Sequence, residues 1–202
     1  MHFMDEYSKE EKKLLLDLAR KSIEYFMEKR ELMHVNESSI PDKLKKKKVT
    51  FVTLEKNGML RGCIGSLQAH EPLYLNVVKN AVAAAFYDVR FMPVMKEEMD
   101  EIEIEISVLT EPERVDYKNV EELLRKIKPK KDGLIIKLGS RSATFLPQVW
   151  EQLPSKEEFL SHLCMKAGLR RDEWKNGKIE VYKYNVISFK EKWQDYFFNK
   201  LK

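Results

Sequence analysis

The sequence predicts an α+β protein in which two similar strand-and-helix repeats form a largely antiparallel sheet. Strand patterns come in pairs joined by short turns, which is typical of antiparallel sheets, and not singly between long helices. The order hairpin, helix, strand occurs at about 49–109 and again at about 134–189. Since 202 residues suffice for one domain or for two lobes that share a core, we expect a single domain over residues 1–202.

The first element is a helix over residues 8–30. Ser8 and Glu11 form a capping box, which is a signature of a helix start. Apolar residues then recur at helical spacing: Leu14, Leu15, Leu18, Tyr25 and Phe26. One face of this helix is therefore expected to pack on the rest of the protein, and residues 31–48 to connect it to the first repeat.

The first repeat opens with a hairpin, because residues 49–54 and 59–64 alternate like strands around Asn57-Gly58, a strong hairpin turn signal. Pro72 suits the first turn of a helix that runs to about Tyr87, whose apolar face is expected to lie over the hairpin. Isoleucine or valine then alternates with glutamate or serine from residue 101 to 108, which predicts a strand with one face in the core.

The second repeat follows a short helix that Asn119 opens. Residues 134–138 and 143–146 predict a hairpin, Ser155 caps a helix that Gly168 closes, and residues 179–189 predict a strand. The C-terminal tail, 190–202, is too apolar to stay free in water, so we expect it to dock on the body of the protein. Its large apolar residues are Trp193, Tyr196, Phe197 and Phe198.

Composition narrows the class of protein. No apolar run approaches the roughly 20 residues that span a bilayer, and the N-terminus lacks the order of a secretory signal, so a cytoplasmic protein without a membrane partner is expected. A net charge of +4 is too small to favour nucleic acid, and the block Lys45–Lys48 is interpreted as a solvated lead-in to a strand. The 35% of charged residues is typical of heat-adapted proteins.

The stretch Leu60-Arg61-Gly62-Cys63-Ile64-Gly65 is the leading candidate site. Two glycines, at 62 and 65, lie beside a guanidinium and a thiol, and residues two apart on a strand share a face. Cys63 is either a nucleophile, its pKa lowered by Arg61 or Arg90, or a small packed thiol. Arg61 either anchors a carboxylate or phosphate, or forms a structural ion pair with Asp88 or a glutamate of residues 101–105.

Further candidates for substrate binding come from other segments: Gly62, Gly65, His70, Asp88, Arg90, Arg141 and Gln148. Each has a structural alternative, such as an ion pair for Arg90 and an exposed loop position for His70. Cys164 is interpreted as a packed thiol. No His, Cys, Asp or Glu cluster has metal-ligand spacing and no nucleotide-binding glycine pattern occurs, so neither metal nor cofactor is expected.

The chain resembles the AMMECR family, named after the Alport syndrome, mental retardation, midface hypoplasia and elliptocytosis candidate region, as a single-domain member of archaeal type. The resemblance covers about residues 49–190. It is carried by 51–54, 60–65, Asp88-Val89-Arg90-Phe91 with Pro93, 104–110, 132–136, 144–150 and 159–169. Ser142-Ala143 departs from the pattern, which more usually has glycine before the threonine. The resemblance implies two similar repeats in two lobes, with the Arg-Gly-Cys segment near a cleft.

Three functions follow. The first is an enzyme or enzyme component that holds a small anionic substrate through Arg61 and Arg90, with Cys63 as nucleophile. The second is a non-catalytic module that binds a protein or, with less support, nucleic acid. The third is a scaffold in which the glycine-rich segment is structural. The sequence favours the first over the second, and it leaves the substrate, the partner and the oligomeric state open.

Overall fold

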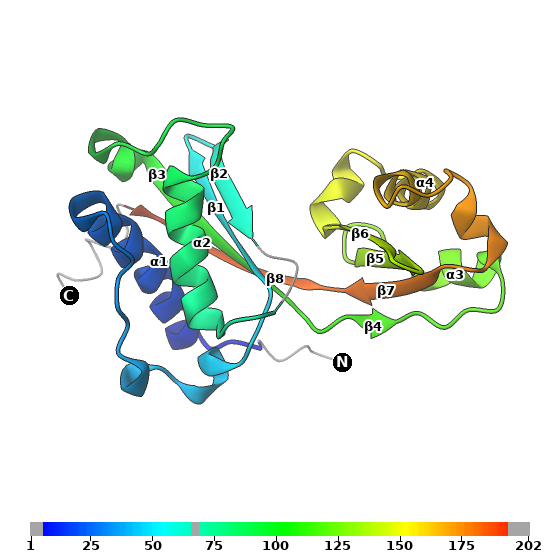
Figure 1. Ribbon diagram of the computed structural model, residues 1–202, viewed down its shortest axis with the longest axis horizontal. Helices are drawn as coiled ribbons and strands as arrows, with labels where there is room; N and C mark the ends of the chain where they lie inside the picture. The colour runs from blue at the N-terminus through cyan, green and yellow to red at the C-terminus, as the bar shows by residue number, and fades with distance from the viewer. Residues whose placement is uncertain (1–5, 66–68, 194–202) are drawn as a thin grey trace. The chain divides into compact units, whose positions relative to one another are not determined.

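The computed structural model describes residues 6–65 and 69–193 (Figure 1). The chain divides into two units, Met1–Val108 with Ile187–Lys202 and Leu109–Val186, called unit 1 and unit 2 below. Each has its own antiparallel four-stranded sheet and its own helices. The predicted α+β class with two repeats is therefore confirmed, whereas the predicted cleft stays a prediction.

Unit 1 contains the first repeat. The hairpin is β1 (Thr50–Lys56) and β2 (Met59–Gly65), and the strand after the helix is β3 (Ile102–Leu109). With β8 (Val186–Lys192) the strand order is β2-β1-β3-β8, so β2 is an edge strand. The hairpin turn forms as predicted, with positive φ at both central residues, 52° at Asn57 and 75° at Gly58.

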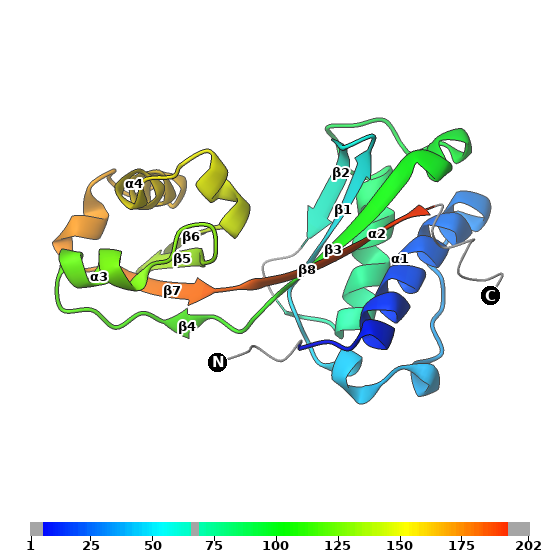
Figure 2. The same ribbon diagram turned by 180° about the vertical axis from the view of Figure 1, so that it is seen from behind.

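Two helices, α1 (Lys9–Lys29) and α2 (Leu73–Phe86), lie on the same face of the unit 1 sheet (Figures 1 and 2). The capping box of Ser8 and Glu11 is present as predicted. The buried side chains of β1 and β3 face these helices, and residues 102, 104, 106 and 108 are all in the core. Tyr25, predicted to pack, is 37% exposed, because the buried face of α1 runs instead through residues such as Ala19 and Ile23.

Unit 2 contains the second repeat. Its hairpin is β5 (Gly133–Leu138) and β6 (Arg141–Phe145), and β7 (Glu180–Tyr184) follows the helix. With the short β4 (Glu113–Arg114) the strand order is β4-β7-β5-β6. In both units the first hairpin strand lies between its partner and the strand that follows the helix. The duplication seen in element order therefore extends to strand order.

The core of unit 2 lies between its sheet and two helices, α3 (Val120–Lys126) and α4 (Lys156–Lys166). Both helices begin at the predicted caps, since Asn119 and Ser155 accept backbone hydrogen bonds at their starts. Trp150 stacks on Phe159 with ring centroids 3.7 Å apart, which fills the centre of this core. Short 3-10 helices complete the described chain: η1 (Glu37–Ser39), η2 (Asp42–Lys45), η3 (Lys96–Glu101), η4 (Pro147–Glu151) and η5 (Glu173–Asn176).

The fourth strand of each sheet follows the last strand of the other repeat in the chain. β8 follows β7 in the chain but joins the sheet of unit 1, and β4 follows β3 but joins the sheet of unit 2. β8 runs to Lys192, three residues beyond the predicted end of the last strand at residue 189, and the docking of the tail 190–202 stays a prediction. Trp193 is buried with 2% exposure, whereas Tyr196, Phe197 and Phe198 lie outside the described residues.

Candidate functional site

The glycines of the candidate stretch allow close packing. A Cβ at Gly62 would lie 2.1 Å from the carbonyl oxygen of Ala84, so α2 can approach β2 only if residue 62 has no side chain. A Cβ at Gly65 would lie 2.3 Å from the ring of Phe51. Because side chains alternate along a strand, those of residues 61 and 63 lie on the face opposite α2. Both glycines have a packing role, and their part in substrate binding stays a prediction.

The guanidinium of Arg61 holds the segment that follows α2. Its Nη1 donates to the carbonyl of Met92 at 2.8 Å, and its Nη2 donates to the carbonyl of Pro93 at 3.3 Å. Nη2 also forms a 2.6 Å ion pair with Glu98, and the two side chains are only 15% and 11% exposed. The structural partner of Arg61 is therefore Glu98 of η3, and not Asp88 or a glutamate of residues 101–105.

The electrostatics of Glu98 agree with this role. Burial alone would raise the pKa of Glu98, but hydrogen bonds from Arg61 and from the backbone N–H of Met95 outweigh it and hold the pKa below its usual value. The carboxylate therefore stays charged and keeps its partner.

Asp88 and Arg90 complete the exposed edge of β2. The Asp88 carboxylate accepts the backbone N–H of Cys63 at 2.9 Å, and Arg90 donates to the carbonyl of the same residue at 3.2 Å. Arg90 also donates twice to Asp88, at 2.9 and 2.6 Å. The pair thus satisfies backbone groups that an edge strand otherwise leaves to solvent.

The hydrogen bonds from Arg90 hold the pKa of Asp88 well below its ordinary value, and those to Asp88 raise the pKa of Arg90. We call Arg61, Asp88, Arg90 and Glu98 the clasp, because together they fix residues 87–95 against β2.

Cys63 is partly buried, and its sulfur lies 3.3 Å from the hydroxyl of Thr53 on β1. The predicted partner His70 is exposed, and residues 66–69 separate it from β2, of which 66–68 lie outside the described residues. Cys164 is fully buried, and burial raises the pKa of its thiol, which confirms the interpretation as a packed cysteine. The role of Cys63 as a nucleophile stays a prediction.

The two remaining candidates belong to unit 2. Arg141 donates through Nη1 to the carbonyl of Gly168 at 2.7 Å, so it caps the end of α4. Gln148 is an exposed residue of η4. The structure thus brings together Arg61, Gly62, Cys63, Asp88 and Arg90 in unit 1.

The described chain contains no group of three His, Cys, Asp or Glu side chains placed to hold a metal ion. No described helix is both long enough and apolar enough to cross a bilayer. Two lysines of the basic block form ion pairs, Lys45 with Asp42 at 3.0 Å and Lys48 with Glu6 at 3.7 Å, so part of its charge is neutralised.

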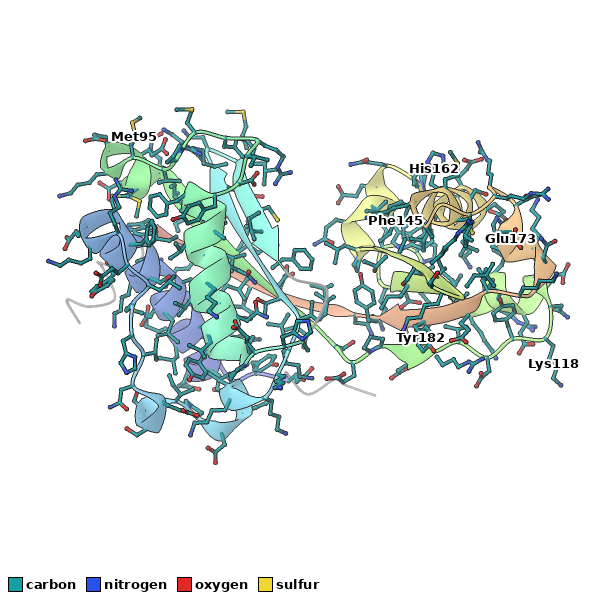
Figure 3. All side chains as sticks on the ribbon, in the orientation of Figure 1. Met95, Lys118, Phe145, His162, Glu173 and Tyr182 are labelled. Atoms are coloured by element: carbon teal, nitrogen blue, oxygen red, sulfur yellow. The ribbon has the colours of Figure 1, made fainter. Side chains whose placement is uncertain are left out.

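The structure adds a feature that the sequence interpretation missed. Nine large apolar side chains are exposed in the described residues, and six of them lie on residues 59–60 and 87–95. We call these six the apolar patch: Met59, Leu60, Tyr87, Val89, Met92 and Met95. Figure 3 shows the side chain of Met95 at the outer edge of unit 1. The sequence feature that could have indicated this patch is Val89, an apolar residue between two charged ones in a segment with no strand or helix pattern.

Comparison with known proteins gives one consistent result. The AMMECR1 family model matches residues 16–189. A protein of Thermofilum pendens is 40% identical over 203 residues, which cover 93% of each chain. Protein MK0488 of Methanopyrus kandleri is 39% identical over 190 residues, 90% of this chain and 89% of that protein. The crystal structure of uncharacterized protein PH0010 from Pyrococcus horikoshii has a TM-score of 0.79 and 38% identity, over 92% of this chain and 94% of that one.

Proposed function

The chain belongs to the AMMECR1 family, and we propose that it is a protein-binding module whose docking surface is the apolar patch. The observation that carries the proposal is the concentration of exposed apolar side chains on the start of β2 and on residues 87–95, a segment that a set of ion pairs holds against β2. Val89 is 99% exposed and Met92 is 81% exposed, although neither lies at a chain end. Such exposure marks interaction surfaces when the residues are gathered and not scattered singly.

The clasp supports the same function, because it limits the freedom of the patch before a partner arrives. The carbonyls of Met92 and Pro93 are bonded to Arg61, and the N–H of Val94 donates to the carbonyl of Ala85 at 2.8 Å. Asp88 in turn fixes the start of the segment on β2. Binding to an ordered segment loses less conformational entropy than binding to a free one, so the same contacts give a higher affinity.

The composition of the patch favours a protein partner. Three of its six members are methionines, whose unbranched and polarizable side chains adapt to partner surfaces of varied shape. Tyr87 adds an amphipathic ring, a residue type that is enriched at the centres of interfaces. The cytoplasm, expected from the sequence, is where we propose that this partner is met.

Site-specific photocrosslinking tests the proposal. A photoreactive amino acid is placed at Val89, at Met92 or, as a matched control, at Met165, an exposed apolar residue of α4 with 52% exposure. We expect the first two positions, and not the third, to yield one crosslinked protein in cells that produce the chain. That protein, once purified, is expected to bind at least about tenfold more weakly to a Val89→Ser, Met92→Ser variant than to the wild type.

A control is needed for folding. Both serine substitutions are at exposed positions, so the unfolding temperature should be unchanged within about 2 °C. Equal crosslinking at all three positions, or unchanged binding of the serine variant, would refute the proposal. A crosslink to a second copy of the chain would make the patch an oligomer interface, which also contradicts it.

The second candidate is the small-anion site that the sequence favoured. One observation supports it: the Arg90 side chain is 53% exposed and donates to the backbone of Cys63, so a cationic group stands beside a partly accessible thiol. Alkylation of the wild type and of Cys63→Ser across pH tests it. A thiol at residue 63 that titrates near the ordinary value of about 8.5 and reacts slowly would remove the nucleophile.

A further inference from the structure

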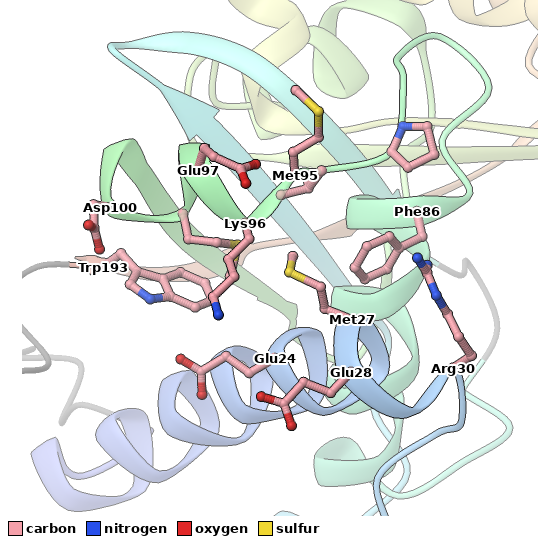
Figure 4. Close-up of a pocket in the computed structure, with 13 residues that line it drawn as sticks. Glu24, Met27, Glu28, Arg30, Phe86, Met95, Lys96, Glu97, Asp100 and Trp193 are labelled. Atoms are coloured by element: carbon pink, nitrogen blue, oxygen red, sulfur yellow. The ribbon is translucent and has the colours of Figure 1, made fainter.

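Beside the apolar patch, unit 1 contains a cavity of about 600 Å³ (Figure 4). It lies between α1, the end of α2, the segment 93–95, η3 and the end of β8. Its volume is in the range of cavities that bind a drug-sized molecule or a few side chains, roughly 300–1,000 Å³. Pro93 and Met95 line it, and both belong to the segment that the clasp holds, so the cavity and the patch are continuous.

The floor of the cavity is apolar. Phe86 and Met27 are half-buried, while Val94, Met99 and Trp193 are buried with exposures of 4, 6 and 2%. In Figure 4 the side chains of Met27 and Phe86 lie together between α1 and α2, and the indole of Trp193 lies at the other end. Burying a large apolar side chain of a ligand against this floor makes binding more favourable.

The rim of the cavity is acidic. Four carboxylates line it, from Glu24, Glu28, Glu97 and Asp100, against two cations, Arg30 and Lys96. Figure 4 shows that the first two, Glu24 and Glu28, come from α1. Among the described residues, the side chains of 28, 97 and 100 have no hydrogen bond or ion pair, so their charges are available to a ligand.

From this charge pattern we infer that the cavity binds a basic amphipathic peptide segment of the partner protein. One large aromatic or aliphatic side chain of the peptide enters over Met27 and Phe86, and Lys or Arg residues beside it pair with the acidic rim. This inference rests on the proposed function, which it deepens by naming the chemistry of the partner. Complementary charge of this kind raises association rates and selects among partners.

Peptide selection on the full-length chain tests the inference without knowledge of the partner. A random dodecapeptide library is selected on immobilised wild-type protein, and the enriched peptides are synthesised. We expect them to contain a large apolar residue within about three positions of Lys or Arg, the spacing of one helical turn. We also expect their affinity to fall when salt rises from about 0.05 M to about 0.5 M, because salt screens surface charge.

The critical variant removes the rim charge: Glu28→Gln, Glu97→Gln and Asp100→Asn together. We expect about tenfold weaker binding of the selected peptides, since three charge contacts are lost at a screened surface. The matched control changes the net charge equally with Glu113→Gln, Glu121→Gln and Glu151→Gln, three exposed acids of unit 2. It should bind as the wild type does.

Several results would overturn the inference. Enriched peptides without an excess of basic residues, or equal binding to the rim variant and its control, contradict the assigned chemistry. At least tenfold tighter binding to a full-length Phe197→Ser, Phe198→Ser variant would identify the chain's own residues 194–202 as competitors and remove the need for a foreign peptide.

The two proposals fail in different ways. If the crosslinked partner binds the rim variant as tightly as the wild type but loses affinity for the Val89→Ser, Met92→Ser variant, only the cavity assignment fails. If it keeps its affinity for both variants, the proposed function fails as well.

Discussion

Replacing Arg61 by methionine separates a structural role of this residue from a ligand-binding role. Methionine keeps much of the apolar stem but removes the bonds to Met92 O, Pro93 O and the Glu98 carboxylate. Among the described residues, Lys56 at 3.4 Å is then the one cation left beside the Glu98 carboxylate, whose side chain is 11% exposed. Losing a charged partner at a largely buried carboxylate, together with two hydrogen bonds to backbone carbonyls, should lower the free energy of unfolding by about 3 kcal/mol.

Chemical denaturation measures this loss directly, and for a chain of this size it corresponds to a decrease of roughly 6–12 °C in unfolding temperature. Hydrogen exchange should also become faster at the amides of residues 88–95, because their segment is released from β2. Arg141→Met is the matched control, since that exposed arginine donates one bond, to Gly168, and should cost less than about 1 kcal/mol. A loss for Arg61→Met no larger than that of the control would refute the clasp.

Two further outcomes follow from the same geometry. The pKa of folded Asp88 lies below its unfolded value of about 3.9, so its stabilisation is present above that pH and is lost as pH falls toward the folded value. An Asp88→Asn variant should therefore be less stable than the wild type at neutral pH. Urea titrations should show the difference in free energy of unfolding between the two proteins shrinking below about pH 4. A difference that stays constant with pH would contradict this linkage. Gly62→Ala should lower the free energy of unfolding by about 1–3 kcal/mol, because the new Cβ meets the backbone of Ala84. Gly58→Ala is the comparison, since a Cβ there has open space and only the positive φ of the turn is strained.

Much of the fold could be predicted because its signals are local. A capping box depends on residues three apart, and a two-residue turn depends on Asn57 and Gly58 alone. Alternation over residues 102–108 identifies a strand and its core face without knowledge of the neighbours. The predicted helix starts were confirmed at Ser8, Asn119 and Ser155.

In the candidate site too, local features could be predicted and contacts between distant residues could not. The spacing of Arg61 and Cys63 determined that both share a face, but the identity of the Arg61 partner could not be read from spacing. Glu98 is 37 residues away in the chain and lies beside Arg61 because α2 and the segment after it bring the chain back to β2. The sequence interpretation chose nearer or strand-borne acids because it had no distance in space by which to rank them.

By itself, the sequence determined the class, the family and the order of the elements in each repeat, since all of these follow from short-range periodicity and motif order. The tertiary structure alone decided that β4 and β8 join the sheet of the other repeat. It also decided that Val89 and Met92 are exposed and that Met27 and Trp193, 166 residues apart, line one cavity. The physical reason is that burial and charge pairing depend on which distant surfaces meet, and an apolar residue carries the same letter whether it is covered or left in water.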